Sequence, residues 1–123
     1  MVVGWATRRE TGFQNVNEKD GAGVGVGVFQ ITVSPTSGVT AAQAGNLTWA
    51  ANYAGNLLSS NMSYLGNKFP NFRPDQLLQA TAASYNMNPY NPKNFTGNPN
   101  TIDDGTANGN YGSNVVQIME HCF

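Results

Sequence analysis

The sequence has little charge, a single cysteine and no long apolar run, and each shortage excludes a class of protein. One cysteine in 123 residues rules out an intrachain disulfide framework and a multi-cysteine metal site. Charged residues make up 11%, against about 25% in an average soluble protein. The six Lys and Arg are spread along the chain and form no basic patch, which argues against a nucleic-acid binder. No apolar run approaches the roughly 18 residues of a membrane span, and the start shows no signal-peptide pattern.

Apolar and uncharged polar residues fill the space that charge leaves. Hydrophobic residues make up 40%, with six Phe, five Tyr and two Trp, and the net charge is only −1. This composition supports one folded domain over 1–123 rather than a disordered chain. Seventeen Asn indicate a largely neutral polar surface. Such a surface suits neutral hydroxylated ligands, although Asn is also an ordinary turn residue.

Hydrophobic spacing predicts a mostly helical chain with one small glycine-rich β element, an α+β class. The expected elements are a helix over 2–12 ending at Gly12, a polar turn over 14–21, strands within 21–33, a short helix over 39–45, helices over 47–68 and 74–86, a loop over 87–109 and a helix over 110–120. Pro74 and Asp75 are typical of a first helical turn. The helix over 47–68 is expected to bury Leu47, Ala51, Ala54, Leu58, Met62 and Leu65.

Seven carboxylates are few enough to sort by elimination, and Glu10 stands out. It shares a predicted helix face with Val3 and Ala6, near the C-terminal end of that helix. Burial and the helix dipole would both raise its pKa, as a general acid requires. A surface Glu10 paired with Arg8 or Arg9 is the structural alternative. The other carboxylates are explained by a helix N-terminus, by turns, by a polar loop or by solvent: Asp75, Asp103, Asp104, Glu18, Asp20 and Glu120.

Other chemical motifs fail on spacing. His121 and Cys122 are neighbours, so on a helix they would point apart, close to the end of the chain. The glycines of 21–27 alternate without the third glycine of a dinucleotide loop, and no phosphate-binding Gly-Lys-Ser/Thr follows. No His, Asp and Glu set has metal-ligand spacing. We therefore expect neither a metal nor a cofactor.

Four motifs follow one another along the chain. They are Arg9-Glu10-Thr11-Gly12-Phe13; Gly27-Val28-Phe29-Gln30-Ile31; Lys68-Phe69-Pro70 with Asp75-Gln76-Leu77-Leu78 and Ala83-Ser84-Tyr85-Asn86; and Asp104-Gly105-Thr106 with Tyr111 and Val115-Val116. In this order they resemble motifs of the goose-type lysozymes and lytic transglycosylases. The first resembles that family's catalytic Glu motif, the second its Gly-Leu-Met-Gln-Val/Ile motif, the third its segment ending in Ala-Tyr-Asn-Ala-Gly, and the fourth its closing helix.

The resemblance implies a lysozyme-like fold and a substrate, the β-1,4 bond between N-acetylmuramic acid and N-acetylglucosamine in peptidoglycan. Glu10 would protonate the glycosidic oxygen. Gln30 and the backbone around Phe29 would bind the sugar near the scissile bond, and Tyr85 and Asn86 would bind it across the cleft. Thr32 and Tyr111 complete the expected substrate-binding set. The resemblance further implies a secreted, bacteriolytic monomer whose partner is peptidoglycan or a chitooligosaccharide, not a nucleic acid or a membrane.

Three departures from the family keep alternatives open. Thr32 replaces the family's Asp, so an inverting hydrolase would need another carboxylate about 6.5–9.5 Å from the acid. Asp20 is the candidate base. Without it, intramolecular attack would give the anhydro product of a lytic transglycosylase, and without catalysis the chain would be a wall-binding module. Met87-Asn88 replaces Ala-Gly, and only nine residues precede Glu10, so either the chain is a minimal form or N-terminal helices of the family are missing.

Overall fold

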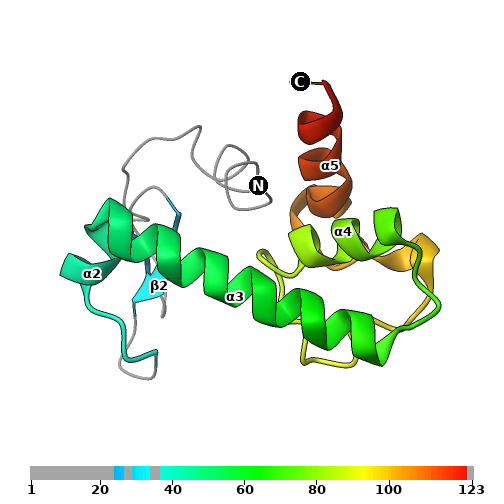
Figure 1. The fold of residues 1–123 in the computed structure, drawn as a ribbon, viewed down its shortest axis with the longest axis horizontal. Coiled ribbons are helices and arrows are strands. Elements are labelled where there is room, and N and C mark those ends of the chain that lie inside the picture. The colour runs from blue at the N-terminus through cyan, green and yellow to red at the C-terminus, as the bar shows by residue number, and fades with distance from the viewer. Residues whose placement is uncertain (1–23, 27–28, 34–36, 122–123) are drawn as a thin grey trace. The chain divides into compact units, whose positions relative to one another are not determined.

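A computed structural model describes residues 24–26, 29–33 and 37–121 of the chain. The predicted helix over 2–12, the turn over 14–21 and Cys122 lie outside these residues. The described part is mostly helical with a small strand element, as the sequence predicts (Figure 1). It divides into two compact units, and the boundary between them falls within one long helix, between Asn56 and Leu57. Among the described helices, none is both long and apolar enough to cross a membrane.

The first unit is built on a β-hairpin and a short helix. Strands β1 (Val24–Val26) and β2 (Ile31–Val33) pair antiparallel, which confirms the period-two prediction, and Val26 lies opposite Ile31. Helix α2 (Ala41–Gly45) packs against both strands. A capping box starts α2: the Gln43 N–H donates to Thr40 Oγ1, and the Thr40 N–H donates to Gln43 Oε1, each at 3.1 Å. The sequence predicted this helix two residues too early, because the N-cap is Thr40.

Helix α3 (Leu47–Lys68) has the predicted bounds (Figure 1). The stripe of residues predicted to be buried along it is partly wrong. Leu47 is 63% exposed and Met62 is 38% exposed. The buried positions repeat at helical spacing and are Ala50, Ala54, Leu58, Asn61 and Leu65. Hydrophobicity alone predicted that Met62 is buried and that its polar neighbour Asn61 is exposed. In the structure Asn61 is the buried residue, because its amide Nδ2 donates to the buried Ser84 Oγ.

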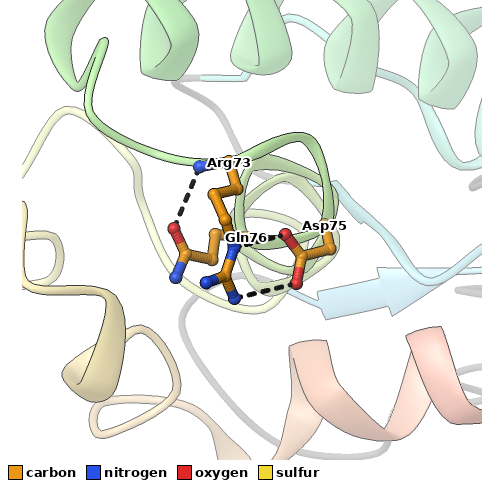
Figure 2. Close-up of polar contacts among 3 residues, drawn as sticks. All are labelled: Arg73, Asp75 and Gln76. Atoms are coloured by element: carbon orange, nitrogen blue, oxygen red, sulfur yellow. Dashed lines mark hydrogen bonds and ion pairs between the residues drawn. The ribbon is translucent and has the colours of Figure 1, made fainter.

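Helix α4 (Pro74–Ala83) begins where the sequence predicts and ends three residues earlier than expected. Pro74 occupies the first helical position, and the Arg73 N–H donates to Gln76 Oε1 at 2.9 Å. The Arg73 guanidinium donates one hydrogen bond to each carboxylate oxygen of Asp75, both at 3.2 Å (Figure 2). Asp75 thus fills the first-turn role that the sequence assigns to it, where a negative charge complements the helix dipole.

The second unit has a hydrophobic core formed by residues of α3, of α4 and of the segments that follow these two helices. The loop that follows α4 contains two short 3-10 turns, η1 (Pro99–Thr101) and η2 (Ala107–Gly109), before helix α5 (Tyr111–His121). Helices α4 and α5 pack against each other. The buried members of the core cluster are Leu65, Phe69, Ala80, Ala83, Phe95 and Ile102. The predicted loop and final helix are thereby confirmed, with the helix shifted by one residue.

Candidate functional site

The two predicted catalytic carboxylates, Glu10 and Asp20, lie outside the described residues. The first of the four motifs, over 9–13, also lies outside the described residues, and so do Gly27 and Val28 of the second motif. The geometry that can be built is therefore that of the predicted substrate-binding residues, three on the hairpin of the first unit and three in the second unit.

The hairpin carries Phe29, Gln30 and Thr32. Phe29 is 6% exposed, so its side chain is anchored in the interior. Gln30 is half-buried and has a φ of 51°, a left-handed conformation that a glutamine side chain seldom adopts. Thr32 is exposed and pairs with Gly25 across the hairpin. A left-handed residue is common in the loop of a β-hairpin, so the turn between β1 and β2 accounts for this conformation and the ligand role of Gln30 stays a prediction.

Tyr85 and Asn86 follow directly after α4, where the helix unwinds. The N–H groups of Asn86 and Met87 both donate to the Ala83 carbonyl, at 3.0 and 3.1 Å, so the chain turns tightly. The Asn86 side chain is exposed, and its Oδ1 accepts from the Ala107 N–H of η2 at 2.8 Å. No described residue accepts a hydrogen bond from its Nδ2. The carboxamide is thus held in one orientation with its donor side available, while Tyr85 is half-buried beside it.

A buried polar cluster supports this turn from behind. Ser84 Oγ donates to the Thr81 carbonyl at 2.6 Å and accepts from Asn61 Nδ2 at 3.0 Å. Asn61 is 1% exposed, and its Oδ1 has no hydrogen-bond partner in the part of the chain that the structure describes. The cluster ties the last turn of α4 to α3. Sequence reasoning missed Asn61 because nothing in its local pattern distinguishes a buried amide from a solvated one.

Asp103 is a second buried polar residue with a role that the sequence did not reveal. It lies in a turn, as predicted, but its carboxylate accepts from the N–H groups of Gly112 at 2.6 Å and Ser113 at 2.9 Å. Gln79 Nε2 of α4 donates to the same carboxylate at 2.7 Å. Asp103 therefore caps α5 and links it to α4. The capped groups are nine and ten residues away, which hides the cap from short-range motifs.

Tyr111 is the first residue of α5 and is 1% exposed. Its N–H donates to Thr106 Oγ1 at 3.1 Å, so Thr106 adds a second cap to the same helix. As placed, the Tyr111 side chain is a packing element, and its assignment to substrate binding stays a prediction. Glu120, by contrast, is exposed, as expected for a solvated carboxylate.

The ion pair between Arg73 and Asp75 shifts the pKa values of both side chains. The hydrogen bonds from Arg73 lower the pKa of Asp75 below its ordinary value, and the same contact raises the pKa of Arg73. Both side chains are largely exposed, so the pair belongs to the surface at the start of α4. Among the described residues, no group of three His, Cys, Asp or Glu could hold a metal ion.

Comparison with known proteins gives the chain no relatives to draw on. No family model, no curated protein and no solved structure matches it.

Proposed function

We propose that the chain is a peptidoglycan muramidase of goose-type lysozyme character, built on a lysozyme-like fold. The observation that carries the proposal furthest is the turn after α4. Its Tyr85-Asn86 pair matches the family's Tyr-Asn motif, and the Asn86 carboxamide is fixed by Ala107 with its Nδ2 available as a donor. The mostly helical chain with one small hairpin is compatible with this proposal. Its activity would be exerted on bacterial walls outside the cell.

In the proposed reaction, Glu10 donates its proton to the glycosidic oxygen as the bond between that oxygen and C1 of N-acetylmuramic acid breaks. In hydrolysis, water forms the new bond to C1 and gives its proton to Asp20. In the alternative, a lytic transglycosylase, the 6-hydroxyl of the same sugar attacks C1 and gives its proton to the Glu10 carboxylate, which forms a 1,6-anhydro product. Thr32 in place of the family's Asp favours this alternative, because it removes one carboxylate that could activate water.

The direct test replaces Glu10 with Gln and measures the clearing of a bacterial wall suspension. We expect the rate to fall by about 10²–10⁴-fold, the usual contribution of a general acid. Glu120→Gln is the matched control and should lyse walls like wild type, because Glu120 is exposed on α5. If Glu10→Gln clears walls as fast as wild type, the catalytic role of Glu10 is wrong. Wild type that binds walls without lysing them would support the wall-binding module instead.

Mass spectrometry of the released muropeptides then separates the two reactions. A reducing muramic acid end indicates hydrolysis, and a 1,6-anhydro end indicates transglycosylation. Asp20→Asn adds to this measurement: it should abolish hydrolysis if Asp20 is the base. Unchanged turnover in a folded Asp20→Asn variant would remove that role.

A third variant, Asn86→Asp, tests the turn after α4. An aspartate oxygen can still accept from the Ala107 N–H, but the Nδ2 donor is lost. The melting temperature should therefore stay close to that of wild type while wall lysis falls about tenfold, as expected when a substrate hydrogen bond is lost. Full activity in this variant would show that Asn86 does not contact the sugar.

A further inference from the structure

The turn η2 contains the pair Asn108-Gly109, and no other Asn of the chain precedes a glycine. An Asn carboxamide is open to attack by the backbone nitrogen of the next residue, and a side chain on that residue hinders the approach. Three of the seventeen Asn precede proline, which has no N–H, and thirteen precede another residue with a side chain. The sequence therefore selects Asn108 as the residue at which this reaction is fastest.

Solvent reaches both residues of the pair. Asn108 and Gly109 are exposed, and no described atom lies within 4 Å of the position that a Cβ would take at Gly109. Asn100 and Asn110 of the same loop are also exposed, but each precedes a residue with a branched or aromatic side chain. Exposure is thus shared within the loop, and the missing side chain at Gly109 is what distinguishes Asn108.

The conformation of η2 slows the reaction because it holds the two reacting groups apart. Asn108 has a φ of 59° and a ψ of 10°, and Gly109 has a φ of 65°. Asn-Gly favours turns with two successive positive φ values, and this ψ directs the Gly109 nitrogen away from the Asn108 side chain. The Gly109 N–H also donates to the Thr106 carbonyl at 2.9 Å. Attack therefore requires that the turn open and that this hydrogen bond break.

We propose that Asn108 is a site of spontaneous deamidation, a modification that η2 slows and that ends in aspartate or isoaspartate. The Gly109 nitrogen loses its proton to a base in the solvent and forms a bond to Asn108 Cγ. The Cγ–Nδ2 bond breaks, and Nδ2 takes a proton from water and leaves as ammonia, which closes a succinimide ring. Water then opens the ring, at Cγ to give aspartate or at the backbone carbonyl carbon to give isoaspartate.

Isoaspartate at position 108 disturbs the neighbouring Asn86. The main chain then runs through the former side chain and is one carbon longer, so the short turn η2 cannot keep its geometry. The Ala107 N–H of this turn donates to Asn86 Oδ1 at 2.8 Å, and we expect that hydrogen bond to weaken. Because Asn86 is a proposed sugar contact, wall lysis would fall as well, and this last consequence alone rests on the proposed function.

The experiment incubates the protein at mildly alkaline pH, native in one sample and unfolded in guanidinium chloride in another. Peptide mapping by mass spectrometry locates each replacement of NH₂ by OH. We expect Asn108 to convert first in both samples, and about two- to tenfold more slowly in the native one, because a hydrogen bond must break first. Asn100 and Asn110 are the internal controls and should stay intact.

Two results of the peptide map would overturn the proposal. Earlier conversion of another Asn in the native protein would show that Asn108 is not the modification site. Equal rates in the native and unfolded samples would show that η2 does not slow the reaction. Asp104-Gly105 can form the same ring, but that reaction leaves the mass unchanged and is therefore not counted.

Asn108→Asp separates the added main-chain carbon from the added charge. Aspartate tolerates a positive φ, so this variant should keep the turn, and it has no Nδ2 to lose. Hydrogen exchange at the Ala107 N–H, followed by NMR, should match that of fresh wild type in Asn108→Asp and be about tenfold faster in the purified isoaspartyl form. Unchanged exchange in the isoaspartyl form would refute the effect on Asn86.

Wall lysis by aged protein distinguishes failure of this inference from failure of the proposed function. Lysis by wild type should fall as the isoaspartyl fraction grows, whereas lysis by Asn108→Asp should stay constant over the same incubation. A fall of equal size in both proteins would refute the link between position 108 and lysis. Fresh wild type that lyses no walls would refute the proposed function, and the peptide map would still decide whether Asn108 deamidates.

Discussion

At the residue scale, Asn61 shows how a helix can bury a polar side chain on its apolar face. Ala54, Leu58 and Leu65 flank it on the buried side of α3, and its Nδ2 reaches Ser84. Its Oδ1 has no partner among the described residues, although an unpaired buried acceptor costs about 1–3 kcal/mol. The hydrogen bond to Ser84 offsets part of that cost and fixes the end of α4 against α3.

We predict that Asn61→Leu changes the free energy of unfolding by less than about 1 kcal/mol, or increases it. Leucine has the same branched side-chain skeleton and removes the unpaired oxygen, while Ser84 keeps its bond to the Thr81 carbonyl. Asn61→Asp should instead lower the unfolding free energy by more than about 2 kcal/mol, because it buries a charge. Urea denaturation measures both values. Equal effects of the two substitutions would contradict this account of the site.

The Arg73–Asp75 pair gives a prediction about pH. Because the pKa of Asp75 is lowered in the folded chain, its contribution to stability is present above the unfolded value of about 3.9. That contribution is lost as the pH falls through the folded pKa. Arg73→Gln removes the hydrogen bonds and the charge, so the pKa of Asp75 should rise toward its ordinary value, as measured by NMR titration of the carboxyl carbon. Lys93→Gln is the control and should leave it unchanged; an identical shift in both variants would show that general charge, not the contact, sets this pKa.

At the element scale, the packing of α4 against α5 depends on a glycine. A Cβ at Gly112 would overlap the Gln79 carbonyl oxygen and would lie 3.0 Å from Asp103 Oδ1 and 3.1 Å from the Ala83 Cβ. The missing side chain is what lets the Gly112 N–H approach the Asp103 carboxylate. The packing of α4 against α5 and the Asp103 cap of α5 therefore both depend on the absence of a side chain at Gly112.

Gly112→Ala should destabilise the protein by about 1–3 kcal/mol, because the helices must separate to admit the methyl group. Gly45→Ala in α2 is the matched control: nothing lies within 4 Å of its Cβ position, and alanine favours a helix by up to about 1 kcal/mol. Thermal or urea unfolding of both variants tests the pair. A Gly112→Ala variant as stable as Gly45→Ala would mean that α4 and α5 do not meet at this glycine.

The elements that local sequence signals define were predictable, and those set by distant contacts were not. Pro74 marks the start of α4 as the sequence predicts, and Asn46 caps α3 at its predicted start. The start of α2, which the Thr40 N-cap sets, was instead predicted two residues too early. The end of α4 is set three residues earlier than the hydrophobic pattern suggests, where Ser84 bonds back to Thr81 and across to α3. Of the candidate site, the motif singled out Tyr85 and Asn86, but the hydrophobic pattern placed both inside the helix over 74–86 and not in the turn after α4. The partner of the Asn86 carboxamide was not predictable, since Ala107 lies 21 residues away.

At the scale of the whole molecule, scarcity of charge would govern the encounter with a bacterial wall that the proposed function requires. Such walls are anionic, and the net charge of the chain is −1, so no long-range attraction draws the two together. No Asp, Glu, Lys, Arg or His occurs between Asp20 and Lys68, so this stretch also carries no charge that could attract an anionic wall. Recognition under the proposed function must then come from short-range hydrogen bonds and aromatic contacts, which salt does not screen.

Wall lysis should therefore respond weakly to salt. Raising the ionic strength from about 0.01 M to about 0.15 M shortens the Debye length from about 30 Å to about 8 Å, which abolishes steering where it exists. We expect the initial lysis rate to stay within about twofold, or to rise as weak repulsion is screened. A triple variant with lysine at the exposed positions Asn52, Asn56 and Asn67 of α3 would have a net charge of +2 and should lyse walls faster at low salt, with a steep decline as salt is added. A steep decline in wild type would instead reveal a local cationic surface that the net charge conceals.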